Sequence, residues 1–189
     1  MNMKKVFSKI RTQHRAFAQT RREIIALSNE ALSWSKRAIF ALHRDDEKQT
    51  IILLEQAALL FATAENSMKN VASLRYEGAH RAALEEYAEA LLFLHYVQTG
   101  TIGAIEARAM DPMVYLAGLA DATGEIVRYT VRQVTQGKKD RVVHARDTVE
   151  HIIEFMLELD ATGYLRTKFD QAKGNLKRLE DLLYDVSLR

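Results

Sequence analysis

The sequence predicts an all-α protein, a single-domain bundle of about six to seven long helices that takes in residues 1–189. Pro112 is the only proline and just eight glycines interrupt the chain, whereas strong helix formers such as Ala, Leu, Glu and Arg are plentiful. No segment alternates between apolar and polar residues as a half-buried strand does. With 48% hydrophobic residues, 189 residues can bury a substantial core as one domain.

Turn and cap residues define the first three predicted helices. The first helix ends near Arg44 and Asp45, and Asp46 follows, so that an aspartate can cap the next helix. Gly78 predicts a kink or break, and Gly100 closes a third helix whose apolar residues point nearly all round, as expected of a central helix. These signals place the helices at about 4–43, 47–76 and 80–98.

Similar signals define the other three helices. Asp111 and Pro112 combine a cap with a proline at the first helical position, which opens a fourth long helix that runs to Gly137. A turn around Gly163 separates the last two helices. They are expected at about 140–160 and 164–187.

The start of the chain is basic. Its first 22 residues carry seven positive charges and no negative side chain. Apolar residues recur among these charges at mostly helical intervals while Arg11, Arg15 and Arg22 fall on another side, so the segment is predicted to be an amphipathic basic helix. Such a face suits phosphates, anionic lipid or an acidic partner helix, and a solvated helix face is the simpler interpretation.

Four carboxylates occupy helix positions at which apolar core residues are expected. Glu86 and Glu89 share one face of the third predicted helix, with apolar residues a turn above and below, and Asp121 and Glu125 share one face of the fourth. If these two faces meet, four like charges converge, and only protons or a divalent cation make that tolerable. The sequence thus predicts a candidate metal site.

The simpler interpretation of these acids is a solvated helix surface, where acidic pairs at this spacing are common. Two pairs on helices rich in Ala, Leu and Gly are less typical of such a surface. Gly118 and Gly124 would also permit the two helix backbones to approach closely. Arg128, three residues after Glu125, is expected to form a helical salt bridge with it.

Several function classes are excluded or disfavoured. Without cysteine the chain has no disulfide, thiolate zinc site or cysteine nucleophile. It lacks the phosphate-binding, dinucleotide-binding and zincin motifs. A ferritin-like di-metal site needs two Glu-x-x-His pairs, and only Glu77 and His80 fit that spacing. No window approaches the roughly 20 apolar residues of a membrane span, so a soluble cytoplasmic protein is expected.

Three segments carry a family resemblance: YAEALLF at 87–93, YLAGLADATGEIVR at 115–128 and LYDVSLR at 183–189. They are similar to the translin family, whose two branches are translin and translin-associated factor X, and the match covers nearly the whole chain. The resemblance implies an all-helical nucleic-acid-binding protein that assembles into a large homo-oligomer, typically an octamer. The last segment is closer to translin, so the chain combines features of both branches, as a single ancestral-type prokaryotic subunit would.

The branch of translin-associated factor X carries an acidic catalytic set, which maps onto Glu86, Glu89, Asp121 and Glu125. The resemblance implies metal-dependent cleavage of single-stranded RNA, with some activity on single-stranded DNA. The first three acids would hold Mg²⁺ or Mn²⁺, and Glu125 would complete the ligand set or orient the attacking water. His80 and Arg81, one to two turns before Glu86, are candidates to reach a phosphate.

Two alternatives remain open at this stage. In one, the chain is a non-catalytic translin-like oligomer that binds single-stranded RNA or DNA, and its acids pair with arginines. In the other, it is an adaptor whose basic N-terminus docks an acidic partner. A first helix of about 40 residues would be about 60 Å long, more than one bundle covers. The apolar stretch at 38–42 is therefore expected to pack against another subunit.

Overall fold

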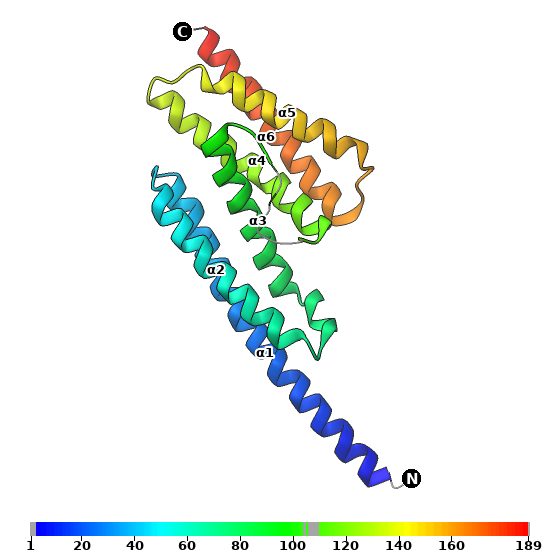
Figure 1. Cartoon of the computed structure of the whole chain (residues 1–189). Helices are drawn as coiled ribbons and strands as arrows, with labels where there is room; N and C mark the ends of the chain where they lie inside the picture. Colours follow the sequence, from blue (N-terminus) through cyan, green and yellow to red (C-terminus); the bar gives the residue numbers. More distant parts are fainter. Residues whose placement is uncertain (1–2, 104, 106–109, 189) are drawn as a thin grey trace.

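The computed structural model describes residues 3–103, 105 and 110–188. Within these ranges the chain forms six α-helices and one short 3₁₀ helix and contains no strand, which confirms the all-α prediction (Figure 1). The elements, in chain order, are α1 (Met3–Leu42), α2 (Glu47–Met68), η1 (Ala72–Tyr76), α3 (Gly78–Thr99), α4 (Pro112–Thr135), α5 (Arg141–Glu158) and α6 (Gly163–Ser187).

The helix α3 is central to the bundle. It packs against the α1–α2 pair on one side and against α4 on the other, and α4 in turn packs against α5 and α6 (Figure 1). Phe93 and Leu92 of α3 are fully buried and belong to two different apolar clusters. Phe93 lies in the larger cluster, to which, besides α3 itself, α1 and α2 contribute most residues and α4, α5 and α6 fewer, and Leu92 lies in a cluster shared with α4, α5 and α6. This arrangement explains why the apolar residues of the third predicted helix point nearly all round.

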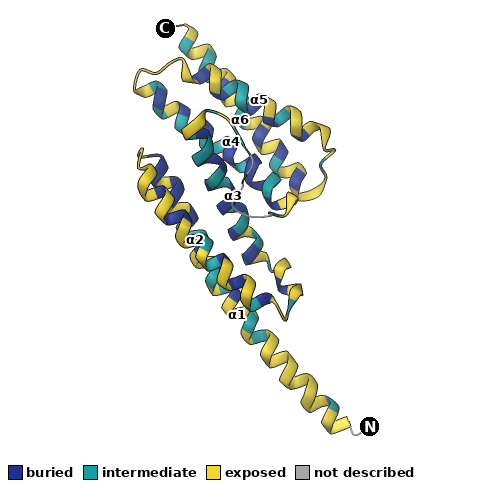
Figure 2. Cartoon of the chain, viewed as in Figure 1, coloured by how far each residue is buried: buried dark blue, intermediate teal, exposed yellow. Residues whose placement is uncertain are grey.

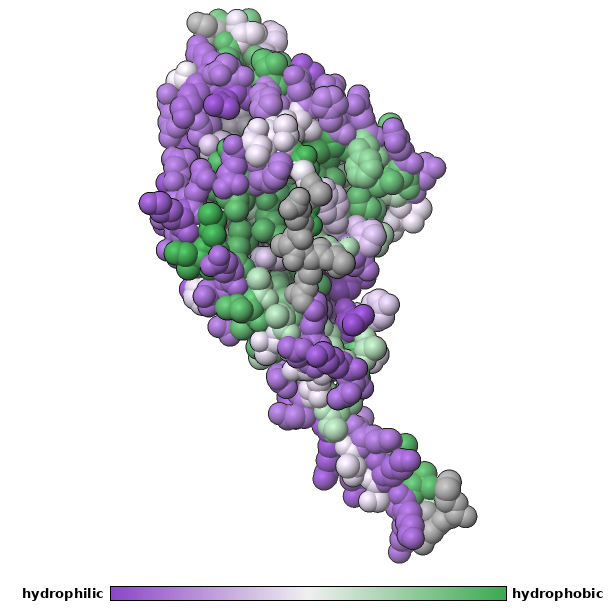
Figure 3. All heavy atoms as spheres, viewed as in Figure 1, coloured by the Kyte–Doolittle hydropathy of each residue, from purple (hydrophilic) through white to green (hydrophobic). Residues whose placement is uncertain are grey.

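The first half of α1 extends beyond the bundle (Figures 1 and 2). Ile24 is the first buried residue of the helix, and we call residues 3–23 the arm. Figure 3 shows mostly hydrophilic side chains along the arm. Four large apolar side chains of the arm are nevertheless exposed: Met3, Phe7, Ile10 and Phe17.

The expectation for the apolar stretch at 38–42 is wrong. Four of its five residues are buried within this chain, and only Phe40 is exposed, at 56%. Arg128 of α4 lies over the Phe40 ring, with 5.1 Å between the guanidinium carbon and the ring centroid. The error has a physical cause: α1 is longer than the bundle at its N-terminal end, so the uncovered part is the arm.

The second predicted helix is also corrected, because α2 ends at Met68 and not near residue 76. The amide of Val71 donates to the Met68 carbonyl at 2.9 Å and closes a turn that contains Asn70, a residue type that favours turns. The short helix η1 follows. This turn lets Leu74 fold back and join Met68 and Ile24 in a small apolar cluster.

The other helix boundaries follow the predicted signals. Asp46 caps α2 by accepting from the Gln49 amide at 3.0 Å, and Asp111 caps α4 by accepting from Met113 at 2.8 Å. Gly100 ends α3 in the left-handed conformation, with φ of 78°. Across the described ranges, none of the helices combines the length and apolar character that a bilayer crossing requires.

Candidate active site

The backbones of α3 and α4 meet at Gly118. A Cβ atom at this position would lie 2.6 Å from the Ala88 Cβ, 2.9 Å from the Glu89 amide nitrogen and 3.0 Å from the Glu85 carbonyl oxygen. No residue other than glycine fits there without a shift of the helices. The predicted close approach is thus confirmed for Gly118. It is wrong for Gly124, where a Cβ would meet only the Asn175 side chain of α6, at 3.4 Å.

This approach brings the two acidic faces together. Asp121 and Glu125 of α4 each raise the pKa of both Glu86 and Glu89 of α3, although burial is the larger cause for each. For Glu89, burial, Glu86 and the two acids of α4 raise the pKa to about 9. Without a cation, Glu89 therefore carries a proton at neutral pH. We call these four side chains the acid cluster.

Basic side chains from three helices approach the acid cluster. Lys168 of α6 pairs closely with Asp121, and the His43 ring, just after α1, contacts Glu125. The ammonium group of Lys36 lies 3.9 Å from Glu86. Arg128 pairs with Glu125 at 3.7 Å, which confirms the salt bridge predicted from their spacing.

The acid cluster fits a hard divalent cation by its chemistry. Several carboxylates from two helices supply the oxygen ligands that Mg²⁺ and Mn²⁺ prefer, and the ammonium of Lys168 already places one positive charge among them. Among the described residues, however, no three acidic or histidine side chains are oriented to hold one ion. Asp121 and Glu125 already pair with Lys168 and His43, so a shared ion would have to use their remaining oxygens or displace these partners.

A second set of residues links α6 to the same part of α3 and was not predicted. The hydroxyl of Tyr164 donates to the Glu85 carboxylate at 2.6 Å, and Arg81 lies 4.0 Å from the other oxygen of Glu85. Glu85 is buried, although it lies next to Glu86 in the sequence and outside the predicted acidic stripe. No spacing rule within one helix reveals Lys168 or Tyr164, because both act on residues of other helices.

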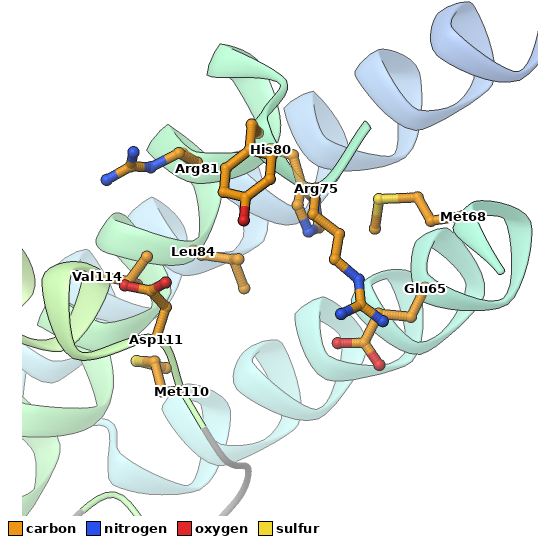
Figure 4. Close-up of a pocket in the computed structure, with 10 residues that line it drawn as sticks. Glu65, Met68, Arg75, His80, Arg81, Leu84, Met110, Asp111 and Val114 are labelled. Carbon is orange, nitrogen blue, oxygen red and sulfur yellow. The ribbon is translucent and has the colours of Figure 1, made fainter. Parts of the chain in front are cut away.

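His80 and Arg81 line a cavity of about 550 Å³ between α2, η1, α3 and the start of α4 (Figure 4). Its described lining residues are Glu65, Met68, Arg75, Tyr76, His80, Arg81, Leu84, Met110, Asp111 and Val114, and none of the acid cluster is among them. The His80 side chain is only 3% exposed, and its Nδ1 lies 3.1 Å from the Ser28 hydroxyl. It is therefore part of the wall, whereas Arg81 is more exposed.

The predicted basic residues of α1 lie on the arm, away from the acid cluster. Arg11, Arg15 and Arg22 are all exposed, and Arg22 donates to the Gln19 side chain at 2.7 Å. Arg21, which was not singled out from the sequence, anchors the base of the arm by donating twice to Glu77, at 2.7 and 3.1 Å. The structure thus groups the four acids together and separates them from these arginines.

Comparison with known proteins finds a family model and several relatives that match this sequence. The model of the Translin family matches residues 19–189. The Translin-associated protein X homolog of Schizosaccharomyces pombe is 26% identical over 193 residues, which cover 89% of this chain and 81% of that protein. Homo sapiens Translin is 26% identical over 137 residues, which cover 61% of this chain and 57% of that protein.

A solved structure shares the fold over nearly the whole chain. It is described as "Structure of AfC3PO - duplex RNA complex", and its TM-score with this chain is 0.87. The two chains are 20% identical, and the match covers 96% of each.

Proposed function

Because the chain belongs to the translin family, we propose that it binds nucleic acid and cleaves single-stranded RNA in a reaction that depends on a divalent metal. The observation that carries this proposal is the acid cluster, in which burial, Glu86 and the two acids of the closely packed α4 raise the pKa of Glu89 to about 9. Four carboxylates gathered on two helices repel one another, and a bound cation would recover the free energy that this repulsion costs. Single-stranded DNA is a second expected substrate.

In this proposal Glu86, Glu89 and Asp121 hold Mg²⁺ or Mn²⁺. A bound ion would supply an activated water and would neutralise the charge that builds on the scissile phosphate. Glu125, which contacts His43, would complete the ligand set or orient that water.

The proposed RNA path follows the basic residues. Arg81 lies on α3 before the acid cluster, and Arg11, Arg15 and Arg22 extend along the arm. Their charges would contact phosphates without reading the base sequence. An RNA duplex is the ligand of one structure with the same fold, which supports RNA as the class of ligand.

We also propose a homo-oligomer, an octamer by family resemblance. The exposed apolar residues of the arm support this, because nothing in the described part of the same chain covers Phe7 or Ile10. A second subunit would remove them from water.

The test is cleavage of labelled single-stranded RNA by the purified protein with Mg²⁺, with Mn²⁺ and with EDTA. Activity with metal and none with EDTA is expected, and Glu89→Gln should abolish cleavage without changing the helical content. Glu154→Gln, which removes an exposed acid of α5, is the matched control and should cleave as the wild type does. Equal cleavage by Glu89→Gln and the wild type refutes the nuclease proposal.

One observation favours a second candidate, a non-catalytic protein that binds single-stranded RNA or DNA. Glu86, Asp121 and Glu125 each have a basic partner within this chain, as structural acids do. In that case neither Mg²⁺ nor Mn²⁺ raises the melting temperature at millimolar concentration, and RNA binds equally well in EDTA. Removal of one acid would then leave its basic partner unpaired and lower the stability.

A further inference from the structure

Lys168 occupies an unusual place for a lysine. It belongs to α6, yet its ammonium group pairs closely with Asp121 of α4, and its side chain is only 17% exposed. The same ammonium lies 5.3 Å from the centre of the Tyr164 ring, one turn earlier in α6. Because lysines are rarely this buried without a specific partner, Lys168 is not an ordinary solvated charge.

The positive charge of Lys168 reaches beyond Asp121. It also acts on Glu86 and Glu89, so three members of the acid cluster interact with one ammonium group. Lys36, the other lysine near the cluster, is 54% exposed and lies 3.9 Å from Glu86, so solvent screens its charge more strongly. Within the described residues, Lys168 is thus the least exposed lysine paired with this cluster.

The position of Lys168 is fixed by the start of α6. Tyr164 donates its hydroxyl to Glu85 of α3 at 2.6 Å, and the ring of the same tyrosine lies beside Lys168. The first turn of α6 is therefore attached to α3, while Lys168 reaches α4 from the next turn. This three-helix arrangement holds the ammonium group against the acid cluster.

We propose that Lys168 is a positioning residue that neutralises Asp121 in the metal-free protein and competes with a divalent cation for the same carboxylate. This inference rests on the proposed metal-dependent function. It explains how two helices can bring like charges together and still pack in the absence of metal. It also predicts that the contact between Lys168 and Asp121 weakens when the ion binds, because both cations then draw on one carboxylate.

The test replaces Lys168 by methionine, which keeps the length of the side chain and removes its charge. The matched control is Lys173→Met, which removes a charge from an exposed residue of the same helix, one that pairs with Asp170 at 2.8 Å. The measurements are Mn²⁺ affinity by titration calorimetry and the melting temperature in EDTA. Neither depends on RNA cleavage.

We expect Lys168→Met to bind Mn²⁺ at least about fivefold more tightly than the wild type, because its internal competitor is gone. In EDTA the same variant should melt at a lower temperature, since Asp121 loses its counter-charge. Lys173→Met should change neither quantity appreciably. Lys168→Arg keeps the charge and should melt in EDTA close to the wild type, which guards against a variant that simply packs badly.

Other outcomes overturn the inference. If the wild type binds Mn²⁺ and Lys168→Met binds it no more tightly than Lys173→Met, then Lys168 does not compete with the ion, while the metal-dependent function stands. If Lys168→Met binds Mn²⁺ more weakly, Lys168 supports the metal and does not oppose it. If no variant binds Mn²⁺ at all, the proposed function and this inference both fail.

Discussion

The acid cluster crowds like charges inside the protein, whereas the arm exposes its charges to solvent. In the acid cluster, the contact at Gly118 forces carboxylates of α3 and α4 together, and burial with like charge raises the pKa of Glu89 to about 9. In the arm, Arg21 pairs with Glu77, and the other positive charges within the first 22 residues lie along an exposed part of α1 (Figure 2). Water and salt screen those charges at little cost.

This difference separates two kinds of binding surface. Burial and mutual repulsion of the carboxylates in the acid cluster cost free energy, which a proton, Lys168 or a divalent cation recovers. The acid cluster is therefore specific for a small cation. The arm costs almost nothing without a ligand, so its affinity for a polyanion comes from counterion release and carries little specificity. Variants of the two regions should differ accordingly, with large effects on stability at the acid cluster and small ones on the arm.

The largest effect is expected from Gly118→Ala. The new Cβ would lie under 3.0 Å from the Ala88 side chain and from the Glu89 backbone, so α3 and α4 must separate. We expect the free energy of unfolding to fall by about 3 kcal/mol in urea denaturation. Gly174→Ala, in the open space of α6, is the control and should gain about 0.5–1 kcal/mol from helix propensity. Equal stability of the two variants would mean that the helices do not meet at Gly118.

The next effect concerns the pH dependence of Glu89. Its pKa is raised from 4.5 to about 9 in the folded protein, so between these values the folded state binds more protons than the unfolded state. The stability that this proton contributes is fully present below about pH 4.5 and is lost as pH rises through about 9. In EDTA the wild type should therefore lose up to about 1.4 kcal/mol of stability per pH unit across this window.

Glu89→Gln cannot titrate and should lose less stability as pH rises, so that it exceeds the wild type most clearly at pH 8 to 9. Denaturant titrations of both proteins at several pH values measure this difference. Glu154→Gln should follow the wild type at every pH. If Glu89→Gln and the wild type have the same slope, the carboxylates are not crowded in solution.

The sequence predicted features that depend on nearby residues and missed those that depend on contacts between distant helices. The helices, and the caps at Asp46 and Asp111, were predicted because their signals lie within a few residues of one another. The two acidic faces were predicted from helical spacing, and their meeting was a conditional inference that the glycine at 118 made reasonable. Lys168, Tyr164 and His43 were missed as partners, because each lies more than 40 residues away in sequence from the acid that it contacts.

The arm shows the opposite kind of error. Its length and amphipathic character were evident from the sequence, but the exposed apolar residues were expected at 38–42, where this chain buries four of the five, and not in the arm. Periodicity gives the face of a helix, whereas only tertiary packing shows which part of that face the same chain covers. Packing between helices raises the pKa values of Glu86 and Glu89. In α1, packing determines only which residues remain uncovered and so form the arm.

A smaller effect on the fold is expected from the double substitution Phe7→Ser and Ile10→Ser. Both residues are exposed in the single chain, so the helical content and the melting temperature should change little. If the arm is covered by another subunit, the molar mass from light scattering at micromolar concentration should fall. Leu157→Ser, an equally exposed position in α5, serves as the control. An unchanged mass for the double variant would show that assembly does not use the arm.

The smallest effect on the fold should come from the joint replacement of Arg11, Arg15 and Arg22 by glutamine. These exposed side chains lie outside the core, so the free energy of unfolding should stay within about 0.5 kcal/mol of the wild type. RNA binding is where they should act: the slope of log affinity against log salt should flatten by about 0.7 for each lost phosphate contact, by a similar amount for unrelated sequences. The same number of exposed lysines replaced elsewhere, at 138, 139 and 177, controls for net charge. A loss of net charge alone would flatten the salt slope equally in the arginine and the lysine triple variants. A flatter slope in the arginine variant than in the lysine variant would show that the arm itself contacts phosphate. Equal slopes in the two variants would mean that the arm is not part of the RNA path.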